Sequence, residues 1–299
     1  MGCRAGRRTA RSSYGRDRGG LAMQFGFLIA AGLSLGLLAG GMARAQSDDT
    51  LRRMTLRQDT AGWEAIGYLD LAGKGFCTGA LVASDIVLTA AHCLMDSRTG
   101  KRVDPTAVKF MAGWRDGEAI ATRQGRAAVI HARYAPDSGT MIERVRHDVA
   151  LLHLAEPISV AQAAPLSPEG GVSPGDSVTV ISYAKGRAKA PSMQRRCRVL
   201  ERRSGVMAMS CDAYFGSSGA PVLSLRGGRV RVVGVMSMIA QTAQGRLSFG
   251  MDVERPLREL LAALRSGRGV FPETTAPAAK RVNLDGGARS SGAKFLRPE

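Results

Sequence analysis

Residues 88–93 of this chain are Leu88-Thr89-Ala90-Ala91-His92-Cys93. They continue an apolar run that starts at Ile86, and β-branched residues in such a run predict a short strand. A histidine and a cysteine follow the strand directly. A histidine in that position can be a hydrogen-bonded core residue, so its meaning depends on what accompanies it elsewhere in the chain.

Short apolar runs broken by glycine, proline and aspartate continue on both sides, between residues 63 and 253. Long helical periodicity is missing from this region. Many short strands over about 190 residues predict an all-β fold with a closed or paired barrel architecture. The runs interpreted as strands are Ala65–Leu69, Ala80–Val82, Ile86–Leu88, Val149–Leu152, Ser177–Ile181, Pro221–Leu223 and Val230–Val235.

Breaker residues gather in the segment 155–176 and predict a boundary between two halves, at about 63–160 and 170–253. After Val253 the pattern changes to helical spacing, with Pro256 in the first turn. We therefore expect a helix over 254–264. Its apolar face carries Leu257, Leu260, Leu261 and Leu264.

The two ends of the chain differ from this middle region. Residues 25–43 lack charged side chains, follow an Arg-rich segment and precede Ala43-Arg44-Ala45, which predicts a signal peptide over 1–45. A retained membrane helix is the alternative, but five glycines in the run favour cleavage before Gln46. The mature protein is then expected to be secreted or periplasmic, with 46–62 as an N-terminal segment or propeptide.

The chain is strongly basic, with 42 Lys and Arg against 25 Asp and Glu. Seven basic residues and one acidic residue precede position 46, so the net charge falls from +17 to +11 on cleavage. The positive charges are spread out, without zinc-finger spacing, an RNA-binding signature or a GxxxxGK[ST] loop, so we expect no nucleic-acid partner. Residues 265–299 predict a disordered basic tail that binds anionic surfaces weakly at most, on a protein expected to be a monomer.

Four cysteines remain after cleavage of the signal peptide, and an even set in an oxidising compartment predicts disulfides. Three pairings are open, and the sequence-local choice joins Cys77 to Cys93 and Cys197 to Cys211. Each bond would close a loop worth about 3 kcal/mol in the chain-entropy model. A metal site is disfavoured because the chain has no C-x-x-C and its histidines do not cluster, so we expect no metal and no cofactor.

Two further stretches carry chemistry, His147-Asp148-Val149-Ala150-Leu151-Leu152 and Gly216-Ser217-Ser218-Gly219-Ala220-Pro221. Together with residues 88–93 they resemble the chymotrypsin/trypsin-like serine protease family. That family carries T-A-A-H-C, D-[IV]-A-L-L and G-x-S-G-x-P motifs in this order. Upstream, Cys77-Thr78-Gly79-Ala80-Leu81-Val82 is similar to the family's C-[GT]-G-x-L-[IV] strand. The resemblance covers about residues 63–264.

The resemblance implies two six-stranded antiparallel β-barrels, a C-terminal helix and an active site between the barrels. It implies a serine endopeptidase that forms an acyl-enzyme with polypeptide substrates, using His92, Asp148 and Ser218. The amides of Gly216 and Ser218 would form the oxyanion hole, and Cys77 would pair with Cys93. The other histidines, His131, His147 and His153, are interpreted as structural. A non-catalytic binding protein on the same fold is the alternative.

One departure from the family pattern concerns the residue before the nucleophile. Members activated from zymogens have an aspartate there that pairs with the newly cut N-terminus, whereas this chain has Ser217. The bacterial glutamyl endopeptidases also lack that aspartate, so the chain is closest in pattern to this exported branch. The Arg52-Arg53 pair is a candidate processing site.

The resemblance also implies a substrate pocket. Asp212 lies six residues before Ser218, a spacing at which an acid favours arginine or lysine before the cut bond. Met236 stands where glutamyl endopeptidases usually have histidine, which counts against glutamate specificity. The predicted pocket residues are Asp212, Ser237, Met238, Ile239 and Gly250.

Overall fold

The computed structural model describes residues 50–137, 139–242 and 245–272. The predicted signal peptide, and the predicted tail from residue 273 onward, lie outside these residues. In the described ranges, no helix is both long enough and apolar enough to cross a membrane.

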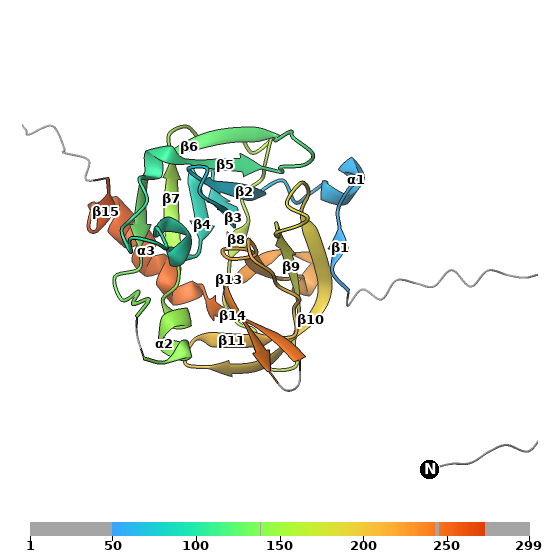
Figure 1. Cartoon of the computed structure of the whole chain (residues 1–299). Helices are drawn as coiled ribbons and strands as arrows, with labels where there is room; N and C mark the ends of the chain where they lie inside the picture. Colours follow the sequence, from blue (N-terminus) through green and yellow to red (C-terminus); the bar gives the residue numbers. More distant parts are fainter. Residues whose placement is uncertain (1–49, 138, 243–244, 273–299) are drawn as a thin grey trace, which may run out of the picture. The chain divides into compact units, whose positions relative to one another are not determined.

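The first barrel occupies the upper part of Figure 1, in blue to green. Its strands pair antiparallel in the order β6-β5-β2-β3-β4-β7, and pairing of β7 with β6 closes the ring. The strands are β2 (Ile66–Leu71), β3 (Phe76–Ala83), β4 (Ile86–Thr89), β5 (Val108–Ala112), β6 (Ala121–Ile130) and β7 (Ala150–Leu154).

The second barrel is built in the same way from later strands. The antiparallel order is β10-β11-β14-β13-β12-β9, and β9 pairs back with β10. Two closed six-stranded rings confirm the predicted fold class. The strands are β9 (Ser177–Ser182), β10 (Ser192–Arg203), β11 (Val206–Met209), β12 (Pro221–Ser224), β13 (Arg231–Thr242) and β14 (Gly245–Asp252).

The strands of both rings are largely buried, and β4 and β12 are buried at every position. In a small barrel every second side chain points inward and fills the interior. In the first barrel Leu69, Leu81 and Phe110 have no exposed surface, and in the second Met207 and Val222 have none. Three short strands pair outside the rings: β1 (Arg52–Arg53) with β10, β8 (Ser167–Pro168) with β13, and β15 (Val270–Phe271) with β6.

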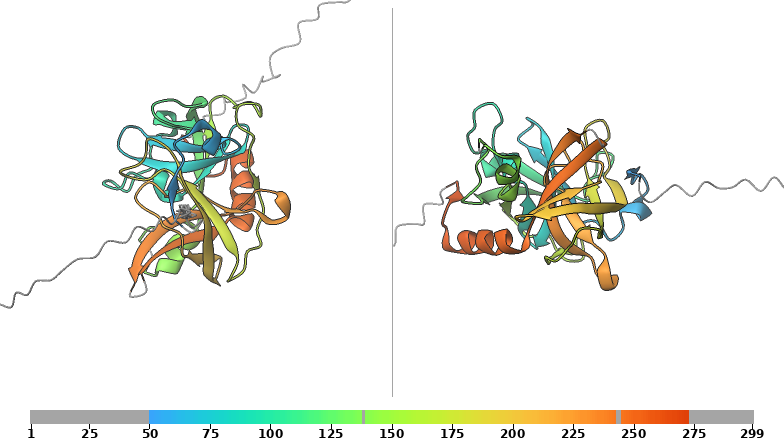
Figure 2. Two further views of the ribbon diagram at one scale, coloured as in Figure 1. Left: turned by 90° about the vertical axis from the view of Figure 1, so that its right-hand side faces the viewer. Right: turned by 90° about the horizontal axis from the view of Figure 1, so that it is seen from below.

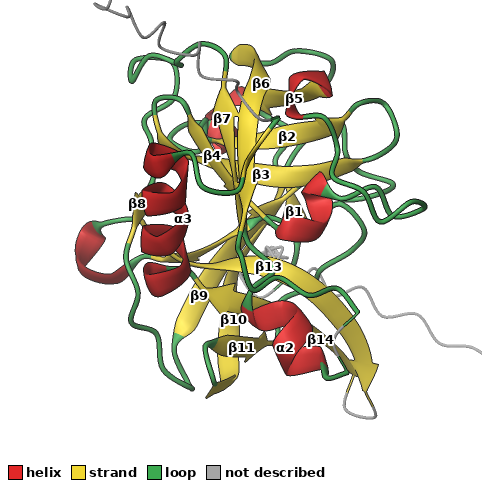
Figure 3. Ribbon diagram, turned by 90° about the vertical axis from the view of Figure 1, so that its left-hand side faces the viewer, coloured by secondary structure: helices red, strands yellow, loops and turns green. Residues whose placement is uncertain are grey.

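Helices are few and short in the described part of the chain. Figure 3 shows α3 running beside the sheets and α2 next to β14. The helices are α1 (Arg57–Thr60), α2 (Met141–Arg146) and α3 (Glu254–Ser266), with 3-10 turns η1 (Ala91–Leu94), η2 (Pro105–Ala107) and η3 (Arg226–Gly228). The two short helices were not predicted, because neither is long enough to show a helical period.

The C-terminal helix packs through the predicted face and extends two residues further than expected. Leu257 and Leu260 are buried, and the helix ends at Gly267, whose φ of 71° lies in the left-handed region that favours glycine. Figure 2 shows this helix in red, along the outside of the sheets.

The prediction of a disordered tail from residue 265 is wrong for its first eight residues. Val270 and Phe271 form β15 against β6, and Phe271 is buried. The guanidinium of Arg102 lies 4.7 Å from the centre of the Phe271 ring. The composition of this segment is polar, and one apolar ring with a docking strand was enough to order it.

The segment 46–62 is part of the folded unit where the structure describes it. Arg52 and Arg53 pair with Ser192 and Met193 on β10. Met54 follows them and has no exposed surface, and its amide donates to the carbonyl of Pro191. A cut after Arg53 would therefore free a residue that lies in the core.

Candidate active site

Three short segments carry the predicted catalytic residues, and two of these residues line one cleft. His92 lies in η1, directly after β4; Asp148 lies between α2 and β7; and Ser218 lies in the loop before β12. His92 and Ser218 both line a cleft of about 790 Å³. Among the described residues no hydrogen bond joins the two side chains, which is common before a substrate is bound.

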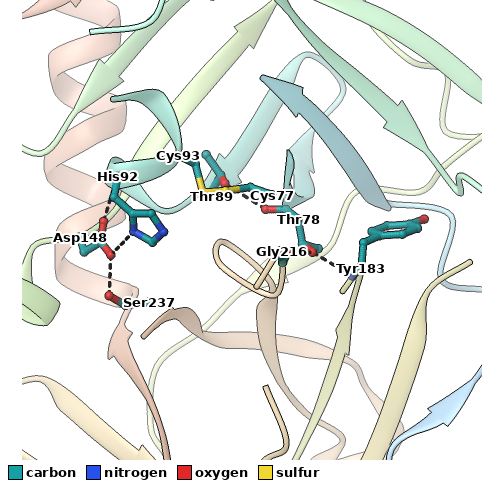
Figure 4. Close-up of a disulfide and its surroundings, with 9 residues drawn as sticks. All are labelled: Cys77, Thr78, Thr89, His92, Cys93, Asp148, Tyr183, Gly216 and Ser237. Carbon is teal, nitrogen blue, oxygen red and sulfur yellow. Dashed lines mark hydrogen bonds and ion pairs between the residues drawn. A yellow bond between two sulfur atoms is a disulfide. The ribbon is translucent and has the colours of Figure 1, made fainter. Parts of the chain in front are cut away.

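Asp148 holds the histidine through two hydrogen bonds. Its Oδ2 lies 2.7 Å from Nδ1 of His92, and its Oδ1 accepts the His92 backbone amide at 2.9 Å. The hydroxyl of Ser237 donates to the same Oδ2 at 2.5 Å, as Figure 4 shows. Asp148 is only 3% exposed, so its charge is met by these donors rather than by water.

This arrangement changes the proton affinity of His92. Burial disfavours the charged imidazolium, but the Asp148 carboxylate and its hydrogen bond outweigh burial. The pKa of His92 is therefore raised above its usual 6.5. Because Asp148 occupies Nδ1, only Nε2 is left to accept a proton from the cleft.

Gly216 and Ser218 present free backbone amides beside the cleft. In the described part of the chain neither amide donates a hydrogen bond, whereas the neighbouring carbonyls are engaged elsewhere. The carbonyl of Phe215, in the same peptide unit as the Gly216 amide, accepts the amide of Lys185 at 2.7 Å, and the carbonyl of Ser217, in the same peptide unit as the Ser218 amide, accepts the amide of Ala220 at 3.1 Å. These two bonds turn the carbonyls away and leave the amides available for an anionic oxygen.

Glycine is needed at two positions of this loop. Gly216 has a φ of 95° and Gly219 a φ of 79°, both in the left-handed region. A Cβ on Gly219 would lie 2.2 Å from the carbonyl oxygen of Thr78, which is backbone and unable to yield. The loop can approach β3 this closely only without side chains at these positions.

Both predicted disulfides are present, in the sequence-local pairing. Cys77–Cys93 ties β3 to η1 next to His92, and Cys197–Cys211 ties β10 to the segment before the serine loop. The sulfurs of the first bond and the His92 ring lie within 4.8 Å of one another. Bonded sulfurs offer no thiolate, so this group does not form a zinc-type site.

Comparison with known proteins agrees with this geometry. Residues 77–235, more than half of the chain, match the trypsin-like peptidase domain. The chain belongs to this family. The match includes the strands, loops and disulfide that carry His92, Asp148 and Ser218.

Individual relatives of this trypsin-like peptidase are distant. It is 25% identical over 169 residues to a glutamyl endopeptidase of Bacillus licheniformis, covering 56% of this chain and 51% of the relative. It is 26% identical over 222 residues to serine protease 23 of Rattus norvegicus, covering 62% of this chain and 56% of the relative. Trypsin Blo t 3 of Blomia tropicalis is 26% identical over 158 residues, 49% of this chain and 53% of the relative. The matches thus span about half the length of these relatives.

A solved structure shares the fold. A Glu endopeptidase in complex with MPD superposes with a TM-score of 0.60 at 18% identity. The superposition covers 74% of this chain and 98% of the other. The chain thus resembles glutamyl endopeptidases in sequence as well as in fold, which is the branch indicated by its motifs.

Ser217 is fully integrated into the site of this trypsin-like peptidase. Its hydroxyl lies 3.0 Å from the hydroxyl of Ser182 on β9 and accepts the Tyr214 amide at 3.2 Å. Both serines are buried. The neutral pair of Ser217 and Ser182 thus stands where family members activated from zymogens have an aspartate paired with the new N-terminus.

The predicted pocket residues separate into two groups. Ser237, Met238 and Ile239 line the cleft, whereas Asp212 and Gly250 are absent from its lining. The Asp212 amide donates to the side chain of Gln194 at 2.6 Å. Gly250 pairs with Met236 on β13 and lets the strands approach, since a Cβ there would lie 2.5 Å from the Val235 carbonyl oxygen.

Sequence reasoning missed two residues that matter at this site. Ser237 was predicted only as a pocket residue, and its contact with Asp148 spans 89 positions of sequence. Phe215 is 78% exposed at the rim of the cleft, an unusual exposure for a large apolar side chain. An aromatic residue directly before the G-x-S-G motif is the sequence signal that could have found it.

Proposed function

We propose that this trypsin-like peptidase is an exported serine endopeptidase that cleaves polypeptides through an acyl-enzyme. Ser218 is the nucleophile, His92 the general base and Asp148 the group that orients His92. A serine hydroxyl is a weak nucleophile, so the reaction needs a base that takes its proton as the bond to carbon forms.

The proton moves through Nε2 of His92. This nitrogen takes the proton of the Ser218 hydroxyl while the oxygen bonds to the substrate carbonyl carbon. The same nitrogen then gives the proton to the leaving amine as the peptide bond breaks. Water, deprotonated by His92 in its turn, hydrolyses the acyl-enzyme and restores Ser218.

Charge develops on the substrate carbonyl oxygen during both steps. The amides of Gly216 and Ser218 are suited to receive it, since neither is engaged elsewhere in the described structure. One such donor is typically worth about 3 kcal/mol of transition-state stabilisation. Because the charge exists only in the tetrahedral intermediate, these donors raise the rate and not merely the affinity.

The observation that carries the proposal is the buried Asp148 carboxylate, held 2.7 Å from Nδ1 of His92 at the wall of the cleft that Ser218 lines. A buried carboxylate is costly unless it is paired. Its pairing with a half-exposed imidazole beside a serine is the arrangement that activates a hydroxyl.

The experiment is labelling of the purified mature protein with a fluorophosphonate probe. We expect the wild type to be labelled, and the Ser218→Ala variant to remain unlabelled. Ser224→Ala, which removes a buried hydroxyl on β12 outside the cleft, serves as the matched control and should be labelled.

A non-catalytic binding protein on the same fold is the alternative. An intact, folded wild type that resists the probe and cleaves no peptide library would favour that reading. Oxidised disulfides and a cooperative unfolding transition would show that the protein tested was folded.

The lining of the cleft supports an apolar residue before the cut bond. Met236, Met238 and Ile239 lie along it, and Asp212 does not. We expect peptides with leucine or methionine before the cut to be hydrolysed faster than matched peptides with arginine or glutamate. If the arginine peptide is hydrolysed faster, and Asp212→Asn abolishes this preference, the specificity predicted from the Asp212 spacing is correct and the apolar one is wrong.

Export is the remaining part of the proposal. Two disulfides are typical of proteins that fold in an oxidising compartment. We expect the secreted or periplasmic protein to begin at Gln46. N-terminal sequencing of protein recovered from the medium or the periplasm tests this, and a chain that retains residues 25–43 would refute it.

A further inference from the structure

A second cavity adjoins the catalytic cleft, and nothing in the proposed chemistry uses it. It has a volume of about 780 Å³ and lies among β2, β3, β5 and the loop that follows β9. Gly75 and Phe76 line both this cavity and the cleft. The two spaces therefore share part of their lining, and we call the second one the aromatic groove.

The walls of the groove are aromatic rings that contact one another. Tyr68 stacks on Phe76 with ring centres 4.9 Å apart, and Trp114 lies 6.0 Å from Tyr68. Tyr183 is fully buried and meets Tyr68 edge-on at 5.7 Å. Tyr68, Phe76 and Trp114 each keep part of their surface exposed, so apolar surface faces solvent inside a cavity.

Hydrogen bonds hold these rings in place. Tyr183 donates its hydroxyl to the carbonyl of Trp114 at 2.9 Å, and the Trp114 indole donates to the carbonyl of Ala188 at 3.2 Å. A preformed pocket of this kind binds an apolar group without first ordering its own walls.

The rim of the groove is basic. Arg53, Arg187 and Lys189 line it with a single acid, Asp70, whose carboxylate already accepts the Gly73 amide at 2.9 Å. Arg53 is paired with Asp116 at 3.5 Å, and the Arg187 guanidinium lies 4.4 Å from the centre of the Tyr214 ring. Lys189 is exposed and forms no ion pair within the residues that the structure describes. The rim therefore attracts a carboxylate.

The position of the groove identifies which part of a substrate would reach it. Phe76 packs against Gly216, because a Cβ on Gly216 would lie 2.1 Å from the Phe76 ring. In Figure 4 Gly216 is drawn between His92, which lines the cleft, and Tyr183, whose ring meets Tyr68 of the groove. Ser237–Ile239, the segment expected to hold the residue before the cut, line the cleft but not the groove.

We propose that the aromatic groove binds the polypeptide segment that follows the cut bond and selects an aromatic residue accompanied by an acidic one. The ring of the substrate packs against Tyr68 and Trp114, and its carboxylate meets Lys189 and Arg187. This inference rests on the proposed endopeptidase function, and it adds a substrate class to it.

The test compares two internally quenched peptides that are identical up to the cut and continue with Phe-Glu in one and Gly-Lys in the other. The wild type is expected to have about tenfold higher kcat/KM for the Phe-Glu peptide. Lys189→Glu should lower that ratio about fivefold. Because both peptides share the residues before the cut, a general loss of activity cancels in the ratio.

Arg229→Glu is the matched control, since it changes the net charge equally and Arg229 is exposed and lines neither cavity. Its ratio should equal that of the wild type. Equal kcat/KM for the two peptides in the wild type, or the same change of ratio in both variants, would overturn the proposal.

Failure of the endopeptidase function itself would show as no hydrolysis of either peptide. The groove is then tested without catalysis, by fluorescence anisotropy with a labelled peptide that begins Phe-Glu, as the released product would. Binding that Lys189→Glu weakens and Arg229→Glu does not would support the groove. Absence of binding to the wild type would overturn it.

Discussion

At the scale of single residues, we expect Asp148 to set the pH range in which His92 can act as a base. The raised pKa of His92 means that its protonated, inactive form persists above pH 6.5. We expect kcat/KM to rise with pH through a single ionisation above 6.5. Asp148→Asn removes the charge that raises this pKa and leaves the burial that lowers it. The rise of kcat/KM with pH should therefore move to lower pH.

The same Asp148→Asn variant should lose about 10⁴-fold in kcat, because the histidine tautomer is no longer fixed. The measurement is the pH profile of kcat/KM in both proteins, with fluorophosphonate labelling to count active sites. If kcat/KM of Asp148→Asn rises at the same pH as in the wild type, the assignment of Asp148 is contradicted.

We expect Ser237 to act as a positioning residue rather than a catalytic one, with its effect in kcat. Its hydroxyl is one of three donors to the buried carboxylate of Asp148. Ser237→Ala removes one of these donors and loosens the hold of Asp148 on His92, for which we expect about a tenfold loss of kcat, equivalent to about 1.4 kcal/mol of activation free energy. Ser237→Thr keeps the hydroxyl and should retain most of the activity. If Ser237→Ala changed KM alone, Ser237 would instead act by binding the substrate in the pocket.

The residues that could be predicted from sequence are those whose partners lie in recognisable motifs. His92, Asp148 and Ser218 each stand in a motif, and the structure brings the first two into contact and the third into the same cleft. Ser237 and Tyr183 act through contacts with residues far away in sequence, and no local pattern marks such a contact. Asp212 had the expected spacing, but spacing along the chain does not determine which way a loop turns.

At the scale of elements, the N-terminal strand is expected to stabilise the fold. Met54 is fully buried after β1, so Met54→Ala should lower the free energy of unfolding by about 2–5 kcal/mol. Leu56→Ala, two residues on and 55% exposed, is the matched control and should change it by less than about 0.5 kcal/mol. Urea unfolding followed by tryptophan fluorescence measures both.

The two variants also test whether 46–62 is a removable propeptide. If Met54→Ala were as stable as Leu56→Ala, the segment would contribute nothing to the core and could be cut away. A stability loss confined to Met54→Ala would show that this segment contributes to the core, and N-terminal sequencing of the mature protein then decides whether a cut follows Arg53.

Strands were predictable where both faces are apolar and less so where one face meets water. Val149–Leu152 was recognised, and the observed β7 agrees with it to within two residues at its end. The long strand β10 was missed because its sequence, SMQRRCRVLERR, is mostly charged on the exposed face. The closing strands of the second barrel therefore came from the family resemblance rather than from the pattern.

At the scale of the whole molecule, the two barrels and α3 meet at a pair of histidines. His131 follows β6 and stacks on His147, which follows α2, with ring centres 4.7 Å apart. Glu259 on α3 lies 2.9 Å from Nε2 of His131. Helix α2 packs against β14 and β11 of the second barrel, and α3 packs against β6 and β7 of the first. Protonation of these histidines is therefore expected to change the free energy of unfolding.

Burial lowers the pKa of both histidines, and for His147 the neighbouring His131, Arg133 and Arg146 add to burial and bring its pKa to about 4. The unfolded chain takes up this proton near pH 6.5, and the folded protein only near pH 4. The stability that His147 contributes is thus complete above 6.5 and is lost as the pH falls from 6.5 to about 4. Glu259 opposes the shift, and its own lowered pKa affects stability only below its ordinary 4.5.

We therefore expect the free energy of unfolding to fall more steeply between pH 6.5 and pH 4 in the wild type than in His147→Asn. His92 acts in the opposite direction, because its raised pKa favours the folded state as the pH falls, so the difference between the two proteins isolates His147. Urea unfolding across this pH range, with His153→Asn as a histidine control on β7, measures that difference. If the free energies of unfolding of the wild type and of His147→Asn change in parallel with pH, the stacked pair does not make the stability pH-dependent. If the two free energies converge at low pH, it does.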